Sequence, residues 1–133
     1  MKFLLSDDNP FLRAAIKKVL FRNYPTAFIE EVKAGSALLA NACNKEYHWD
    51  LIISTIGNTG LAAMEIIEAL QKTKHIPILI LSAVKLEDYA NFGFLDRISG
   101  FILTDNFSEV LPKTINRILS QGVYSIEQTK IAC

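Results

Sequence analysis

Five short apolar runs recur along the chain. The segments between them carry apolar residues at intervals of three or four, which is the spacing of a helix. The run at 50–55 is apolar through its middle, which is typical of a central parallel strand covered on both faces. The run at 27–32 includes Glu30 and Glu31, so it predicts a less buried edge strand whose glutamates are solvated. The predicted strands are residues 2–6, 27–32, 50–55, 77–81 and 100–103.

Helical spacing of apolar residues follows each run. Asn9 and Pro10 supply a cap and a first-turn proline for the first helix. In the last helix Asn106 and Glu109 have the spacing of a capping box, and Pro112 predicts a delayed start or a kink. The predicted helices are residues 10–20, 36–44, 63–70 and 86–95, and a last one that ends near residue 121.

This alternation of strands and helices predicts an α/β fold. We expect a flavodoxin-like, doubly wound, five-stranded parallel sheet with strand order 2-1-3-4-5, in a three-layer α/β/α arrangement. Residues 1–121 form the predicted domain, and residues 122–133 are a tail or the start of a linker. Ligands of such folds bind at the carboxyl ends of the strands.

The amino-acid composition further narrows the kinds of partner that the protein can have. The chain has 133 residues, half of them hydrophobic, with fourteen acids against fourteen lysines and arginines. A neutral chain without a sequence cluster of lysine and arginine predicts no binding of nucleic acid by this domain alone and no binding to a membrane surface. No apolar stretch approaches the ~20 residues that cross a bilayer.

The cysteines and the N-terminus indicate a reducing compartment. Cys43 and Cys133 form neither a metal-binding spacing nor a disulfide framework. The chain turns acidic within a few residues of Met1, unlike a signal peptide. We therefore expect a cytoplasmic protein.

Polar residues stand where the predicted strands end. Asp7 and Asp8 follow the first strand, Thr55 ends the third, Ser82 follows the fourth and Thr104 follows the fifth. Two adjacent acids at a strand end suit Mg²⁺, which prefers oxygen ligands. The same residues, with Asn9, are equally suited to capping the first helix.

Four segments at these strand ends carry a resemblance. "FLLSDDN", "DLIISTIGNTG", "ILILSA" and "SGFILTD" are similar, in this order and spacing, to the receiver domain of two-component response regulators. The resemblance covers residues 2 to 121, and "ILSQGVYS" (118–125) resembles receivers of the branch with a C-terminal helix-turn-helix DNA-binding domain.

The resemblance implies specific roles for these residues. Asp7 and Asp8 correspond to the Mg²⁺-binding acids, Ser82 to the hydroxyl that contacts the phosphoryl group, and Phe101 to the aromatic residue of the switch. Thr55 stands where the family has its phosphoacceptor aspartate, and Thr104 stands where it has a lysine. One acid and one base are lost together, so the net charge of the phosphoryl pocket is kept. Mg²⁺ binding is expected to be weak or lost, and no other cofactor is expected.

We therefore expect a non-enzymatic pseudo-receiver that works without phosphorylation, as a signalling, protein-interaction or dimerisation module. The resemblance implies a protein partner, or a second copy in a homodimer, at the face formed by the fourth helix, fifth strand and fifth helix.

Two alternatives stay open. "STIGNTG" (54–60) echoes the phosphate loop of flavodoxins, which would make the chain a binder of FMN or another phosphate ligand, although that loop follows the first strand and the echo breaks at Ile56. A receiver phosphorylated at Asp7, Asp8 or Thr59 is the other alternative.

Overall fold

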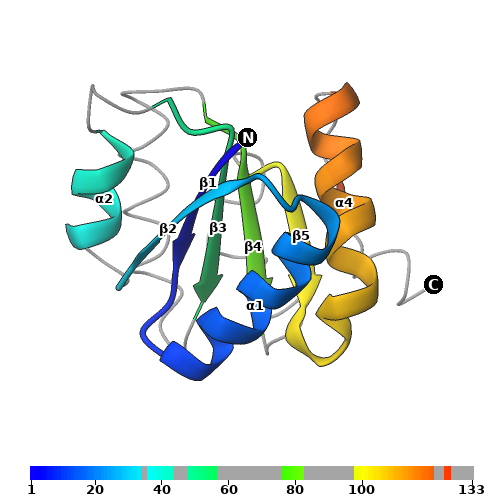
Figure 1. Ribbon diagram of the computed structural model, residues 1–133, viewed down its shortest axis with the longest axis horizontal. Helices are drawn as coiled ribbons and strands as arrows, with labels where there is room; N and C mark the ends of the chain where they lie inside the picture. The colour runs from blue at the N-terminus through cyan, green and yellow to red at the C-terminus, as the bar shows by residue number, and fades with distance from the viewer. Residues whose placement is uncertain (34–35, 44–47, 57–75, 83–97, 122–124, 127–133) are drawn as a thin grey trace, which may run out of the picture.

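The computed structural model describes residues 1–33, 36–43, 48–56, 76–82, 98–121 and 125–126 (Figure 1). The helices are α1 (Pro10–Asn23), α2 (Ser36–Ala42) and α4 (Phe107–Gln121), and a 3₁₀ turn, η3 (Thr104–Asn106), precedes α4. The strands are β1 (Lys2–Ser6), β2 (Phe28–Val32), β3 (Leu51–Ile56), β4 (Ile78–Ser82), β5 (Gly100–Leu103) and β6 (Ser125–Ile126). The predicted helices at 63–70 and 86–95 lie outside the described residues, as does Thr59.

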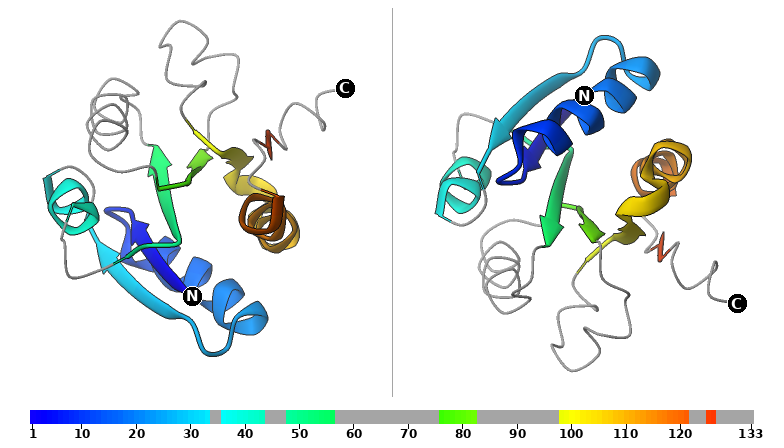
Figure 2. Two further views of the ribbon diagram at one scale, coloured as in Figure 1. Left: turned by 90° about the horizontal axis from the view of Figure 1, so that it is seen from above. Right: turned by 90° about the horizontal axis from the view of Figure 1, so that it is seen from below.

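The strands form one parallel sheet in the order β2-β1-β3-β4-β5-β6. This confirms the predicted order 2-1-3-4-5 and the doubly wound α/β class. Helices α1 and α4 cover one face of the sheet and α2 lies on the other, which gives the three predicted layers (Figure 2).

The sixth strand was not predicted. Residues 122–133 were expected to form a tail or the start of a linker, and that boundary stays a prediction; two of these residues extend the sheet beyond β5. Ser125 pairs with Gly100 and Ile126 pairs with Phe101. A strand of two residues is too short to show a hydrophobic period in the sequence, so it can be identified only from its pairing with β5.

Alternating side chains on the strands build a core on each face of the sheet. Leu4, Ile52 and Ile80, which point away from α1 and α4, are as fully buried as their neighbours in sequence. The central strands are therefore covered on both sides, as the apolar run at 50–55 predicts, whereas β2 is partly exposed along most of its length. The core beneath α1 and α4 consists of Phe3, Leu5, Leu51, Ile53, Leu79, Leu81 and Ile102 from the strands and Ile16, Val19, Leu20, Leu111, Ile115 and Ile118 from the helices.

Helix α1 starts as its sequence predicts. The Asn9 side-chain oxygen accepts hydrogen bonds from the backbone N–H groups of Phe11 (2.9 Å) and Leu12 (3.4 Å), and Pro10 occupies the first turn. These bonds satisfy two of the N–H groups that a helix start leaves without a partner. The N-cap residue is therefore Asn9, and Asp7 supports it by accepting the Asn9 backbone N–H.

Helix α4 begins earlier than Pro112 suggested. The helix starts at Phe107, so the delayed start was wrong, and Pro112 lies inside it. The proline removes the hydrogen bond to the carbonyl of Ser108, and Ser108 is exposed, so water can take that place. A kink at Pro112 and a capping bond between Asn106 and Glu109 stay predictions.

Replacing Asn9 by alanine should lower the free energy of unfolding by about 1 kcal/mol, because the first turn of α1 then loses its side-chain acceptor. Urea denaturation followed by far-UV circular dichroism measures the change. Asn9→Ser is the matched control, since serine keeps an acceptor oxygen and should recover most of the stability. Equal losses in the two variants would show that the cap does not stabilise α1.

Candidate functional site

The first two strand ends of the predicted site are adjacent in the structure. Ser6 of β1 pairs with Ser54 of β3. Asp7 and Thr55 are the residues that follow these two in the sequence, so they lie beside each other at the carboxyl ends of neighbouring strands. Asp7 is largely buried, Thr55 is half-buried and Asp8 is exposed. The parallel register therefore brings the acid pair next to Thr55, the residue that the sequence resemblance assigns to the acceptor position.

The other predicted residues continue along this edge. Ser82 pairs with Ile56 of β3 and with Leu103 of β5, and Thr104 follows Leu103 at the start of the 3₁₀ turn η3. Ser82 is fully buried and Thr104 is half-buried. Phe101 lies three residues before Thr104, fully buried within β5 rather than at its end. The structure thus gathers Asp7, Asp8, Thr55, Ser82 and Thr104 at one edge, with Phe101 deeper in the sheet.

The Asp7 carboxylate has one satisfied and one unsatisfied oxygen. Its Oδ1 accepts a hydrogen bond from the backbone N–H of Asn9 at 3.3 Å, and the Asp7 N–H donates to the carbonyl of Val32 at 3.2 Å. Its Oδ2 is buried and has no hydrogen-bond partner among the described residues. A buried carboxylate oxygen without a partner is costly, so this atom is suited to a hydrogen bond from a water molecule or to contact with a cation.

Arg13 of α1 places a cation beside this edge, where the predicted site residues themselves are acidic or uncharged. Its Nη1 donates a hydrogen bond to the backbone carbonyl of Asp7, and its Nε lies 3.2 Å from Oε1 of Glu31. Lys17 Nζ lies 3.0 Å from the other oxygen of Glu31. The ion pairs connect α1 to the edge strand β2 and hold a guanidinium beside the Asp7 main chain.

This cluster corrects the prediction that Glu31 belongs to a solvated edge. Glu31 is half-buried, and the Lys17 hydrogen bond is the main cause that lowers the pKa of its carboxyl, with Arg13 adding to it and burial opposing it. The available signal was the four-residue spacing of Arg13 and Lys17, which places both on one side of α1. Only the fold shows that this side meets Glu31.

Thr55 carries little chemistry of its own in this position. Its hydroxyl lies 3.5 Å from the backbone carbonyl of Ser6, at the outer limit for a hydrogen bond. A threonine hydroxyl becomes a good nucleophile only when an adjacent base removes its proton. The Ser6 carbonyl can accept a hydrogen bond but cannot act as that base.

The donor set fits a divalent cation poorly. Among the described residues no three His, Cys, Asp or Glu side chains gather into a metal-binding group. Asp7 and Asp8 supply the only carboxylates of the predicted set, whereas Mg²⁺ prefers near-octahedral oxygen coordination. Any ion held there would depend on water and backbone carbonyls for most of its ligands.

Solved structures share this fold. A response regulator receiver domain from Clostridium thermocellum matches with a TM-score of 0.75 and 19% identity over 91% of this chain and 95% of that one. A LuxR family DNA-binding response regulator from Silicibacter pomeroyi matches with 0.77 and 20% over 95% of both chains. The Vibrio cholerae chemotaxis protein CheY4 matches with 0.72 and 25% over 89% and 98%.

The protein therefore has the fold of response regulator receiver domains, and its structural neighbours are such domains. No protein-family model and no curated protein matches the sequence. Within the described part of the chain, no helix is long and apolar enough to cross a membrane.

Replacing Glu31 by glutamine should destabilise the protein in a pH-dependent way. The folded state lowers the pKa of Glu31, so it favours the ionised carboxylate. This stabilisation is present at neutral pH and is lost as the pH falls below about 4.3 and through the folded pKa. We expect the free energy of unfolding to fall by up to about 1 kcal/mol at pH 7, a small value because the ion pairs are partly exposed. In acid, the stability of the variant should approach that of the wild type.

Urea titrations at a series of pH values measure this difference. Glu30→Gln is the matched control, since Glu30 directly precedes Glu31 in β2 and makes no ion pair with a described residue. If Glu30→Gln shows the same pH dependence, the effect belongs to net charge and not to the Arg13–Glu31–Lys17 cluster.

Proposed function

We propose that this protein is a pseudo-receiver, which has the receiver fold without phosphoacceptor chemistry and acts as a phosphorylation-independent, non-enzymatic protein-interaction module in cytoplasmic signalling. The observation that carries the proposal is Thr55, whose hydroxyl stands at the carboxyl end of β3, next to Asp7, with the Ser6 carbonyl as its hydrogen-bond acceptor. An acyl phosphate requires a carboxylate, so the reaction of an active receiver has no acceptor at this position.

The rest of the edge supports the same conclusion. Phosphoryl transfer depends on positioning and on neutralising charge, chiefly through a metal ion and cationic side chains. Thr104 supplies no charge, and the Arg13 guanidinium is bound to the Asp7 main chain and to Glu31. Asp7 and Asp8 alone make Mg²⁺ binding weak or absent.

Phosphorylation of Asp7 is disfavoured by its surroundings. Oδ2 is buried, and Oδ1 already accepts the Asn9 N–H. A phosphodonor must reach a carboxylate oxygen in line with its leaving group, which a buried oxygen does not permit.

A protein partner or a second copy is the proposed target. The expected surface includes β5 and α4, and part of it, the predicted helix at 86–95, lies outside the described residues. In the structure β6 pairs with Gly100 and Phe101 of β5, so a partner at this part of β5 would contact side chains rather than its backbone edge. The DNA-binding regulator among the structural neighbours supports a role in transcriptional control.

The wild-type protein should show no phosphoryl incorporation when incubated with acetyl phosphate and Mg²⁺. The double variant Thr55→Asp with Thr104→Lys should gain it, because it restores the acceptor carboxylate and the cation together, and each single variant should gain less. Intact-protein mass spectrometry detects the added group. Mg²⁺-dependent incorporation into the wild type would contradict the proposal, and an inert double variant would show that these positions are misassigned.

A ¹H–¹⁵N NMR titration with Mg²⁺, followed by beryllofluoride, should leave the amide signals of Asp8, Thr55 and Ser82 in place. The double variant is the positive control, and its signals should shift on both additions. Saturable wild-type shifts that extend to Phe101 would mean that the edge still binds a phosphoryl mimic and transmits it into the sheet.

A further inference from the structure

Within the described part of the chain, six of the eight lysines and arginines lie on α1 and α4. Helix α1 carries Arg13, Lys17, Lys18 and Arg22 with no acidic residue, and α4 carries Lys113 and Arg117 with Glu109 as its one acid. The two helices lie on the same face of the sheet and contact each other. Residues that are far apart in the sequence therefore form one basic surface.

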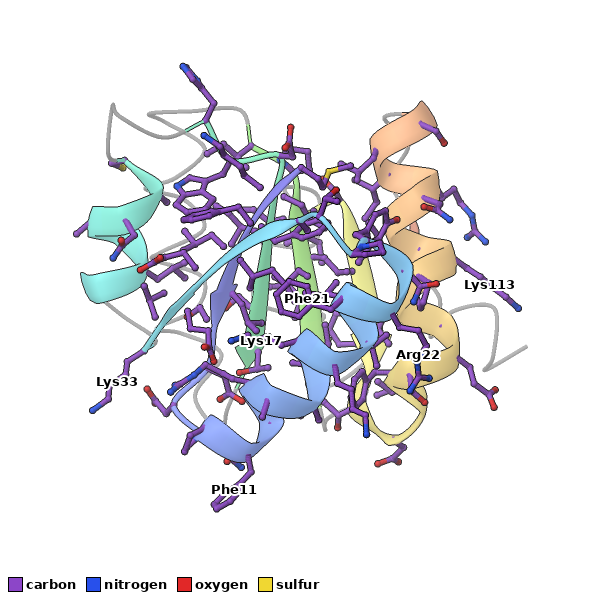
Figure 3. All side chains as sticks on the ribbon, in the orientation of Figure 1. Phe11, Lys17, Phe21, Arg22, Lys33 and Lys113 are labelled. Atoms are coloured by element: carbon purple, nitrogen blue, oxygen red, sulfur yellow. The ribbon has the colours of Figure 1, made fainter. Side chains whose placement is uncertain are left out.

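Three of these cations are unpaired within the described part of the chain. Arg13 and Lys17 are held by Glu31 at the border with β2. Lys18, Arg22 and Lys113 are exposed and make no ion pair with a described residue. Figure 3 shows Arg22 between α1 and α4 and Lys113 extending from the outer side of α4.

Exposed phenylalanines accompany these cations. The side chain of Phe11 is 85% exposed and that of Phe21 is 40% exposed, and both belong to α1. Figure 3 shows Phe21 on the viewer's side of α1 and Phe11 at its N-terminal end. We call Phe11, Lys18, Phe21, Arg22 and Lys113 the α1–α4 surface.

The scaffold of this surface is fixed. Tyr24, which directly follows α1, donates a hydrogen bond from its hydroxyl to the Asn116 side chain of α4. The Tyr24 ring also packs edge-on against Phe3 of β1, with ring centroids 5.4 Å apart. A partner therefore meets a preorganised pair of helices, which reduces the ordering cost of binding.

We propose that the α1–α4 surface binds an acidic, amphipathic segment of a partner protein. Acidic side chains would pair with Lys18, Arg22 and Lys113 by charge complementarity, and apolar side chains would cover Phe11 and Phe21, because aromatic residues and arginine are enriched at protein interfaces. Nucleic acid is the poorer match, since its binding requires a denser basic patch and the chain as a whole is neutral. This goes beyond the proposed function, which specifies neither this surface nor its partner's chemistry.

Fluorescence anisotropy with a labelled helical peptide of about 20 residues, with leucine on one face and glutamate on the other, tests the proposal. We expect saturable binding that weakens as the salt concentration rises. The triple variant Lys18→Glu, Arg22→Glu and Lys113→Glu should weaken binding at least about tenfold. Phe21→Ser should weaken it about threefold, with little change in salt dependence.

Two matched controls separate the surface from net charge and general apolarity. Lys33→Glu controls for Lys113→Glu, since Lys33 is an exposed lysine beyond the end of β2, far from α4 in Figure 3. Phe28→Ser controls for Phe21→Ser, because Phe28 is 42% exposed but belongs to β2. Circular dichroism confirms that each variant is folded.

Four results would overturn the proposal. The first is undiminished peptide binding by the folded triple variant, and the second is an equal loss with Lys33→Glu and Lys113→Glu. The third is binding of a mixed-sequence DNA duplex or of phosphatidylserine vesicles without binding of the peptide, which would assign the surface to nucleic acid or lipid. The fourth is self-association in sedimentation velocity that the triple variant abolishes, which would make a second copy the occupant.

Discussion

Hydrogen bonding in register among the parallel strands β1, β3, β4 and β5 is the constraint on which the rest of the protein depends. Parallel pairing sends every carboxyl end to the same edge, and one residue of slip would exchange the two faces of a strand. The pairs Ser6–Ser54, Ile56–Ser82 and Ser82–Leu103 therefore fix where the predicted site residues lie. The same registers place Leu5, Ile53, Leu81 and Ile102 together beneath α1 and α4.

The edge so formed belongs to a receiver-like fold, and its residues are those on which the proposed function rests. Asp7 is still buried with one carboxylate oxygen free of hydrogen bonds, as in a site built to hold a further group. Under the proposed function, Thr55 and Thr104 stand in place of an acid and a base, so the acceptor and a cation are absent while the local net charge is unchanged.

Two surfaces of the protein are separate from that edge. Along Gly100 and Phe101 the outer edge of β5 is paired by β6, which covers part of the backbone that an edge strand would otherwise offer to other chains. The α1–α4 surface carries exposed phenylalanines and cations that make no ion pair with a described residue, on helices whose inner sides are packed against the sheet. The proposed binding at this surface would leave the core intact and would not depend on the residues at the strand ends.

The sequence by itself determined the strand positions, the doubly wound order and the start of α1, because these depend on local hydrophobic period and on the Asn9–Pro10 cap. It also placed Asp7, Thr55, Ser82 and Thr104 at strand ends, since each directly follows or ends an apolar run. Tertiary structure alone decided the Arg13–Glu31–Lys17 cluster, strand β6 and the meeting of α1 with α4. Each of these joins residues that are distant in the chain, and no local pattern records which distant surfaces the packing of a sheet and its helices will bring into contact.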